Sequence, residues 1–243
     1  MISPKNANIY VTKIAKTVYC GIQKCYNLGM KLYHGSKGTI KQPLVNGSRR
    51  FNDYGPAFYA TRDLASAHEW ACKNGSAGYV NIYEFNTREL NALDLTDRKK
   101  YSVLNWLAIL MHYRNLDKGF VNSFQSRLEY LEENYYIDVT QYDYVIGYRA
   151  DDAYFRFPAD FIRGNITLEQ LEKSFELGKL GIQYVLISDR AINKLTYLET
   201  IPSNDEYVGK YFDNVRDATN RYNNLPKDEE GTRIFDIMKG RHK

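Results

Sequence analysis

Strand-like and helix-like segments follow one another along this chain without the regular strand–helix–strand rhythm of a parallel α/β sheet. Short alternating or β-branched runs, typical of strands, occur at 32–34, 56–61, 78–85, 143–148 and 183–188. No glycine-rich phosphate loop follows any of these runs, which argues against a Rossmann or P-loop protein. The pattern favours an α+β domain.

Apolar residues at three- and four-residue intervals predict helices between and after the strands. We expect these helices over 8–28, from Asp63 onward, over 102–113, over 128–136 and over 167–177. The last one opens with Thr-Leu-Glu-Gln, so Thr167 can cap the helix while Gln170 reaches back. The segment after Pro202 is charged and has only weak helical periodicity. It is predicted to be a helical tail that packs on or flanks the main domain.

Size and composition are those of a soluble globular protein. The chain has 243 residues, 44% of them hydrophobic and 26% charged, and its net charge is +4. No apolar run reaches the roughly 18 residues of a membrane helix, and the N-terminus lacks the features of a signal peptide. Three cysteines without metal-ligand spacing fit a reducing compartment. We therefore expect a cytoplasmic protein, or one delivered into a target cell.

The chain is also rich in tyrosine, with 22 residues of this type. Aromatic side chains can stack on nucleic-acid bases, but no repeated basic–aromatic motif is visible in the sequence. Lysine and arginine alternate with acidic residues along most of the chain. The charge therefore permits a nucleic-acid partner without arguing for one.

Three short motifs occur in a fixed order. Residues 32–36 read Leu-Tyr-His-Gly-Ser, residues 55–61 read Gly-Pro-Ala-Phe-Tyr-Ala-Thr, and residues 183–188 read Gln-Tyr-Val-Leu-Ile-Ser. This series resembles the ADP-ribosyltransferase superfamily, in particular the His-Tyr-Glu branch that includes diphtheria toxin and the poly(ADP-ribose) polymerases. It is most similar to a bacterial group with a Tyr-His-Gly-Ser start, an Asn-Asp-aromatic-Gly motif (here 52–61) and a later Val-Ile-Gly-x-x-Ala-Asp-Asp (here 145–152).

The resemblance implies a fold, an activity and partners. The fold would be α+β, with a split pair of small antiparallel sheets forming an NAD cleft flanked by helices. The domain would span 31–200, between an N-terminal helical extension (1–30) and the tail (201–243). The activity would be mono-ADP-ribosyl transfer from NAD, without a metal, to a protein or a nucleic acid. Bacterial proteins of this kind are often toxins, effectors or phage-defence components, so an antitoxin or regulatory partner is possible.

The first motif would bind the nicotinamide end of NAD. A lone histidine at a strand end is more often structural than catalytic, and only the resemblance assigns His34 a role. By that resemblance His34 would bond the nicotinamide ribose, and the Gly35 backbone would clamp the carboxamide, where a Cβ would push the ring away. Ser36 would add a secondary polar contact.

The second motif and the helix after it would supply aromatic rings. Tyr59 would stack on the nicotinamide, and Trp70, eleven residues later, would close the other ring face. Aromatic faces attract a cationic ring by about 0.5–2 kcal/mol. The alternative is that both rings are core residues at strand and helix spacing.

Gln183 occupies the position where the superfamily most often has a catalytic glutamate. Cleavage of the glycosidic bond builds positive charge on the ribose, so a nearby acceptor or negative charge is favourable. Glutamine keeps a hydrogen bond but supplies neither charge nor base. A charged hydrogen bond contributes about 1.5–3 kcal/mol against about 0.5–1.5 for a neutral one, which slows the chemistry by about an order of magnitude. Chain elongation is therefore not expected.

Charged residues outside the three motifs could complete the site. Four residues precede the second strand and could reach the pyrophosphate or an incoming target, namely Arg49, Arg50, Asn52 and Asp53. The alternative is a solvated charged loop with Asp53 as a turn former, which is favoured for Asp53. Asp151 and Asp152 could contact ribose or acceptor and provide a base, or form a surface cap.

Two other functions fit the same residues. An NAD glycohydrolase would use water as the acceptor, in a cleft closed to large molecules. A catalytically weakened NAD-binding or interaction module would explain Gln183. The intact set of His34, Gly35 and Tyr59 argues against the second alternative.

Overall fold

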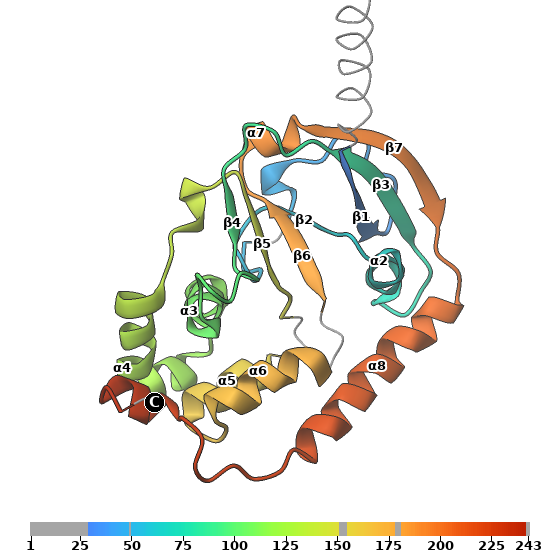
Figure 1. The fold of residues 1–243 in the computed structure, drawn as a ribbon. Helices are drawn as coiled ribbons and strands as arrows, with labels where there is room; N and C mark the ends of the chain where they lie inside the picture. The colour runs from blue at the N-terminus through green and yellow to red at the C-terminus, as the bar shows by residue number, and fades with distance from the viewer. Residues whose placement is uncertain (1–28, 49, 151–154, 178–180, 242–243) are drawn as a thin grey trace, which may run out of the picture.

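The computed structural model describes residues 29–48, 50–150, 155–177 and 181–241. Its centre is a curved seven-stranded mixed sheet with the order β4-β5-β6-β2-β1-β3-β7 (Figure 1). The strands are β1 (Met30–Ser36), β2 (Phe58–Thr61), β3 (Tyr79–Phe85), β4 (Ala92–Asp94), β5 (Tyr144–Tyr148), β6 (Ile182–Leu186) and β7 (Leu195–Pro202). The α+β class predicted from the sequence is confirmed.

The sheet is weakest between β1 and β2. β1 pairs with β3 along its whole length, whereas its pairing with β2 consists of the single register pair Tyr33 and Thr61. β2 and β6 pair over four positions, and only β4 and β5 run parallel. Two separate sheets, as expected from the sequence, are therefore not shown, because this one pair joins the β4-β5-β6-β2 half to the β1-β3-β7 half.

The helices surround the sheet (Figure 1), and several of them begin at a residue whose side chain caps the helix. They are α2 (Leu64–Cys72), α3 (Val103–Tyr113), α4 (Lys118–Tyr135), α5 (Arg156–Arg163), α6 (Leu168–Leu177), α7 (Asp189–Ile192), α8 (Glu206–Asn223) and α9 (Ile234–Met238). Asp63 accepts a hydrogen bond from the Ala65 amide at the start of α2. The predicted capping box of α6 is present, because Gln170 Oε1 accepts from the Thr167 amide and the Gln170 amide donates to Thr167 Oγ1.

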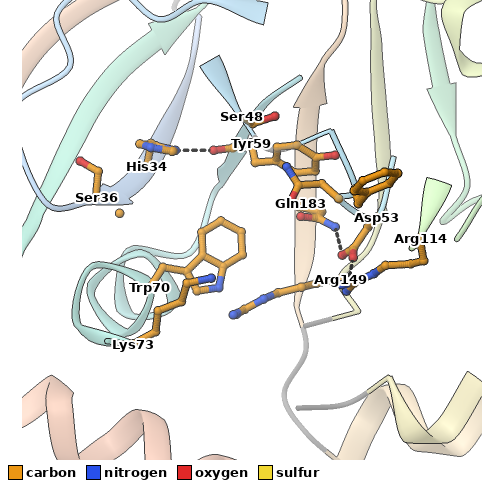
Figure 2. A pocket seen from close by; sticks show the side chains of 13 residues that line it. His34, Ser36, Ser48, Asp53, Tyr59, Trp70, Lys73, Arg114, Arg149 and Gln183 are labelled. Atoms are coloured by element: carbon orange, nitrogen blue, oxygen red, sulfur yellow. Dashed lines mark hydrogen bonds and ion pairs between the residues drawn. The ribbon is translucent and has the colours of Figure 1, made fainter. Parts of the chain in front are cut away.

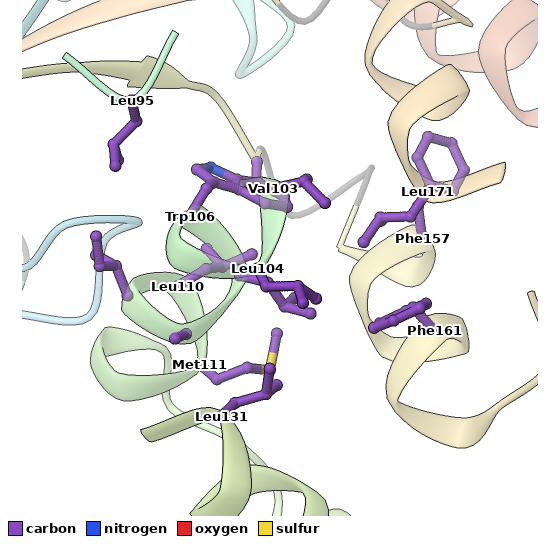
Figure 3. Close-up of a cluster of buried hydrophobic side chains, with 14 of the residues drawn as sticks. Leu95, Val103, Leu104, Trp106, Leu110, Met111, Leu131, Phe157, Phe161 and Leu171 are labelled. Carbon is purple, nitrogen blue, oxygen red and sulfur yellow. The ribbon is translucent and has the colours of Figure 1, made fainter. Parts of the chain in front are cut away.

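The apolar helix α3 is the centre of the larger core. Its buried residues pack between the sheet and helices α4, α5 and α6 (Figure 3). Trp106 is 1% exposed, and its indole N–H donates to the Tyr148 carbonyl at the end of β5. This bond fixes α3 beside the end of the strand, where the polar site begins.

A smaller core holds α2 against the other half of the sheet. Ala67 packs on Val80 and Ile82 of β3, and α8 lies alongside α2 (Figure 1). Beyond the β-sheet, Ala218 and Tyr222 of α8 and Ile234 of α9 belong to the large core. The residues after 200 thus pack on the same body as the motifs.

Some elements were not predicted. α4 begins at Lys118, ten residues earlier than expected, and neither β4 nor α5 was anticipated. α5 contains Pro158, which reads as a helix breaker but lies in the first turn, where proline is tolerated. The helix predicted over 8–28 lies outside the described residues. None of the described helices is both long and apolar enough to cross a membrane.

Candidate functional site

A cavity of about 490 Å³ opens where β1 and β2 separate. That volume lies within the roughly 300–1,000 Å³ typical of small-molecule sites. Its walls come from β1, α2, residues 48 and 51–53, β2, β6 and the segments that follow α3 and β5 (Figure 2). The lining residues are His34, Gly35, Ser36, Ser48, Phe51, Asn52, Asp53, Tyr59, Trp70, Lys73, Arg114, Arg149 and Gln183. The three motifs therefore meet at one place.

His34 is held by a backbone group across the separation between the two strands. Its Nδ1 lies 2.6 Å from the Tyr59 carbonyl oxygen, and its ring contacts Phe58. Because a carbonyl can only accept, Nδ1 carries the proton. Burial lowers the pKa of His34, although the bond to Tyr59 opposes this. The neutral ring therefore keeps Nε2 as a hydrogen-bond acceptor.

Gly35 is required first by helix packing. A Cβ at this position would lie 2.1 Å from the Ala67 carbonyl oxygen and 2.6 Å from the Ala71 nitrogen, both on α2. The sequence-based explanation, that a side chain would displace a ligand ring, therefore misses the nearer obstacle. Ser36 lines the cavity, but its hydroxyl donates to the Gly38 carbonyl at 2.6 Å and accepts from Asn81.

Tyr59 is fixed by its hydroxyl. The hydroxyl donates to the Gly55 carbonyl at 2.6 Å and accepts from the Tyr54 amide at 3.2 Å. Gly55 has a φ of +80°, which favours glycine and turns its carbonyl toward the ring. Burial raises the pKa of Tyr59 well above its usual value, so the phenol stays neutral. Tyr59 therefore offers a ring of fixed orientation and no acid–base group.

Gln183 is almost fully buried, and its amide has one possible orientation. Nε2 donates to Asp53 Oδ2 at 3.0 Å and to the Tyr148 carbonyl at 3.4 Å. Both partners are acceptors, so the NH₂ group must face them and Oε1 must face the other way. Within the described residues no group donates to Oε1. Figure 2 shows the amide nitrogen directed toward Asp53.

Asp53 is the centre of this network and not merely a turn residue. It is 8% exposed, and Arg114 Nη2 lies 2.6 Å from its Oδ1. Its Oδ2 accepts from the Ala150 amide at 2.8 Å as well as from Gln183. Burial raises the pKa of Asp53 above its usual value, and Arg114 and these donors offset only part of that shift. Three donors surround the carboxyl group, an arrangement that suits the ionised form.

Trp70 faces the cavity from α2 and carries a cation on its ring. The Arg149 guanidinium carbon lies 4.2 Å from the ring centroid, within the range of a cation–π contact. The indole nitrogen of Trp70 is buried, and no described residue accepts its proton. Both rings of the expected pair line the cavity, and Arg149 covers one face of Trp70.

The remaining predicted residues divide into three groups. Asn52 lines the cavity, whereas Arg50 is exposed and does not. Arg49, Asp151 and Asp152 lie outside the described residues.

Sequence reasoning missed five lining residues, namely Ser48, Phe51, Lys73, Arg114 and Arg149. Only their position in the folded chain brings them to the site. Within the described part of the chain, no group of three or more His, Cys, Asp or Glu side chains could hold a metal ion.

Comparison with known families gives one match. Residues 30–197 match the family described as "Protein of unknown function (DUF3990)". The chain belongs to the DUF3990 family. The matched region begins at β1 and ends within β7, so it contains every described cavity residue. No curated protein and no solved structure is found to be similar.

Proposed function

We propose that this DUF3990 protein is a mono-ADP-ribosyltransferase that binds NAD in the cavity between β1 and β2. The main support is the orientation of Gln183. Both of its amide hydrogens are used by Asp53 and Tyr148. Oε1 is therefore an acceptor held toward the cavity, where a ribose hydroxyl of NAD would donate to it. This matches the resemblance of the three motifs to the superfamily.

The two halves of the sheet fit this proposal. They meet through the one pair of Tyr33 and Thr61 and then separate, with His34 on one side and Tyr59 and Gln183 on the other. A second hollow of about 200 Å³ shares His34, Ser48 and Tyr59 with the cavity. An elongated site of this kind suits a dinucleotide better than a single small ring. The halves would act as the split pair of sheets expected from the resemblance.

Each residue has a distinct task in the proposed reaction. Nε2 of neutral His34 and Oε1 of Gln183 accept bonds from ribose hydroxyls and so orient the glycosidic bond. Tyr59 and Trp70 cover the nicotinamide ring. This cationic ring replaces the Arg149 guanidinium, which lies over Trp70 in the structure. The bond from C1′ to the nicotinamide nitrogen breaks, and nicotinamide leaves with the electron pair.

Asp53 supplies the negative charge that Gln183 lacks. Its carboxylate accepts from Nε2 at 3.0 Å, which polarises the amide and makes Oε1 a stronger acceptor as positive charge grows on the ribose. Asp53 is a positioning residue here, because the amide lies between it and the substrate. Glutamine backed by a buried carboxylate would thus replace part of the effect of a glutamate.

Binding of NAD and release of nicotinamide test the proposal together. The full chain is incubated with NAD labelled in the adenylate half and a cell lysate, and thermal stability, free nicotinamide and transferred label are measured. His34→Ala and Gln183→Ala should lower nicotinamide release by about tenfold or more, since each removes a ribose hydrogen bond. His112→Ala and Gln125→Ala remove the same residue types at exposed sites and should have no effect.

Each outcome has a clear meaning. Transfer of label that depends on His34 and Gln183 supports the transferase. Release without transfer supports the NAD glycohydrolase. Thermal stabilisation by NAD without release supports the NAD-binding module, in which Gln183 binds and does not promote cleavage. Absence of any effect of NAD refutes the proposal.

A further inference from the structure

A groove continues from the NAD cavity toward helices α4 and α5. A hollow of about 290 Å³ is lined by Phe51, Arg114, Asn115 and Phe155, and it shares Phe51 and Arg114 with the cavity. A larger hollow of about 550 Å³ shares Asn115 and Phe155 with the first and extends to Phe120. Because each hollow shares two lining residues with the next, a linear molecule lying along them would reach the cavity. We call these two hollows the acceptor groove.

Phenylalanine rings and arginines alternate along the acceptor groove. Among the described residues, four rings line the groove, and each has a guanidinium over it at 4.8 to 5.6 Å from the ring centroid. The pairs are Arg50 on Phe51, Arg114 on Phe155, Arg163 on Phe120 and Arg127 on Phe124. The repeated basic–aromatic motif that the sequence lacks is therefore present in the folded chain.

The charge along this path is predominantly positive. Lysine and arginine side chains line the cavity and the groove, namely Lys73, Arg114, Arg149, Arg156 and Arg163. Among the described residues of the same walls, the carboxylates are Asp53, which pairs with Arg114, and Asp117. Asp160 pairs with Arg156 and Arg163 from the adjoining side. The excess of cations favours a polyanionic occupant.

We propose that the acceptor groove binds single-stranded nucleic acid and presents a base to the cavity as the acceptor of ADP-ribose. The proposal rests on the proposed transferase activity of the cavity. Single strands bind where cationic side chains follow the backbone and aromatic rings stack on the bases, and this groove contains both. A duplex hides the faces of its bases. An acidic peptide would use the arginines but would leave the exposed ring of Phe51, 49% accessible, without a stacking partner.

The transfer step is balanced without a further reactant. The C1′–N bond of NAD breaks, and the electron pair stays on nicotinamide. A nitrogen of the presented base donates its electron pair to C1′ and releases its proton to water. The products are nicotinamide, the ADP-ribosylated strand and one proton.

Binding of fluorescent oligonucleotides to the full chain, without NAD, tests the groove directly. Single-stranded DNA and RNA of the same sequence are compared with the DNA duplex and with an acidic peptide. Whichever of the DNA and RNA strands binds more tightly identifies the type of nucleic acid that the groove prefers. Single-strand affinity should be the highest and should fall as salt increases, because phosphate contacts release counterions.

Matched variants separate the groove from general surface effects. Phe51→Ala should weaken binding about tenfold through lost stacking. Phe212→Ala removes an equally exposed ring on α8 and should change nothing. Arg163→Gln should weaken binding and lower its salt dependence. Arg216→Gln breaks a similar pair with an aspartate three residues away, outside the groove, and should change neither.

The outcomes separate this proposal from the proposed activity. Tight single-strand binding that Phe51→Ala and Arg163→Gln weaken, and NAD-derived label on the oligonucleotide, support it. If Phe212→Ala and Arg216→Gln weaken strand binding equally, the proposal is overturned even if NAD is cleaved. Tighter binding of the duplex or the peptide than of the single strand also overturns it. Strand binding in a chain that does not bind NAD would keep the groove as a nucleic-acid site and refute the transferase.

Discussion

The two walls of the cavity hold their polar groups in different ways. On the β1 and α2 wall, His34 is oriented by one backbone carbonyl, and Gly35 allows the helix to approach the strand. On the β2 and β6 wall, Gln183 is oriented by a buried carboxylate with its own arginine. The first wall depends on backbone packing and the second on a charge network. Changes of volume should therefore affect the first wall, and changes of charge the second.

Removing the charge at the centre of the second wall should have the largest effect. Asp53→Ala removes the buried carboxylate that pairs with Arg114 and that accepts from the Ala150 amide. Loss of one member of a buried pair costs about 3–5 kcal/mol, and we expect the free energy of unfolding in urea to fall by that amount. Asp213→Ala breaks an exposed pair with Arg216 and should cost about 0–1 kcal/mol. Equal costs for the two variants would contradict the comparison.

Introducing the glutamate that the ADP-ribosyltransferase superfamily usually has at this motif position should destabilise this chain. Gln183→Glu replaces the donor that faces Asp53 Oδ2 at 3.0 Å with a second carboxylate. We expect a loss of about 1–3 kcal/mol, because a bond is lost and two adjacent carboxylates do not both ionise. The two carboxyl groups then share one proton, which raises the pKa of one of them in the folded state. Relative to the parent chain, stability should therefore fall as pH rises and recover in acid.

Thermal unfolding at acidic and alkaline pH measures this effect. The double variant Asp53→Asn with Gln183→Glu restores one donor and one carboxylate at the same contact, and it should regain much of the lost stability at alkaline pH. If Gln183→Glu alone were as stable as the parent chain at every pH, Asp53 would not be what orients Gln183.

Adding volume to the first wall should destabilise the chain by about as much as Gln183→Glu does. Gly35→Ala places a methyl group against the Ala67 carbonyl and the Ala71 nitrogen, so α2 must shift. Overpacking of this kind costs about 1–3 kcal/mol. We expect a lower melting temperature together with weaker NAD binding, because Trp70 moves with the helix. Gly38→Ala meets no atom within 4 Å and is the matched control. Unchanged stability in Gly35→Ala would show that the helix contact is not tight.

The smallest effect near neutral pH concerns the protonation of His34. Burial lowers the pKa of His34 below its usual 6.5. Between the lowered pKa and pH 6.5 the unfolded chain binds more protons than the folded chain, so the free energy of unfolding falls as pH falls through this range. Below the lowered pKa, Nε2 is protonated and no longer accepts a hydrogen bond. NAD affinity should be flat above pH 6.5 and should fall about tenfold per pH unit below the lowered pKa. Titration calorimetry measures this, and His34→Gln should remove the acid limb. A limb that persists in His34→Gln would assign it to another group.

Local patterns in the sequence were enough to predict much of the fold. The strands at 79–85 and 144–148 and the helix at 103–113 agree with their predicted positions to within a residue. The Thr167 capping box is present because it involves four consecutive residues. By contrast, β4 has three residues and is stabilised by pairing with β5, so nothing local signals it.

The order of three motifs also predicted which residues meet. His34, Tyr59, Trp70 and Gln183 line one cavity although up to 149 positions separate them. The assignment of NAD to that cavity stays a prediction from the resemblance. Sequence reasoning went wrong at Asp53, because an aspartate in a charged loop fits a solvated turn equally well. Its burial depends on Arg114 and Gln183, which lie 61 and 130 positions away.

The sequence by itself determined the periodic elements and the residue types available for chemistry, because these depend on neighbours within a turn or a strand. Tertiary structure alone decided which way Gln183 points, since two acceptors from other segments fix its amide. It also decided that each phenylalanine of the acceptor groove has an arginine over its ring. Long-range packing sets such pairings, and no local pattern encodes them.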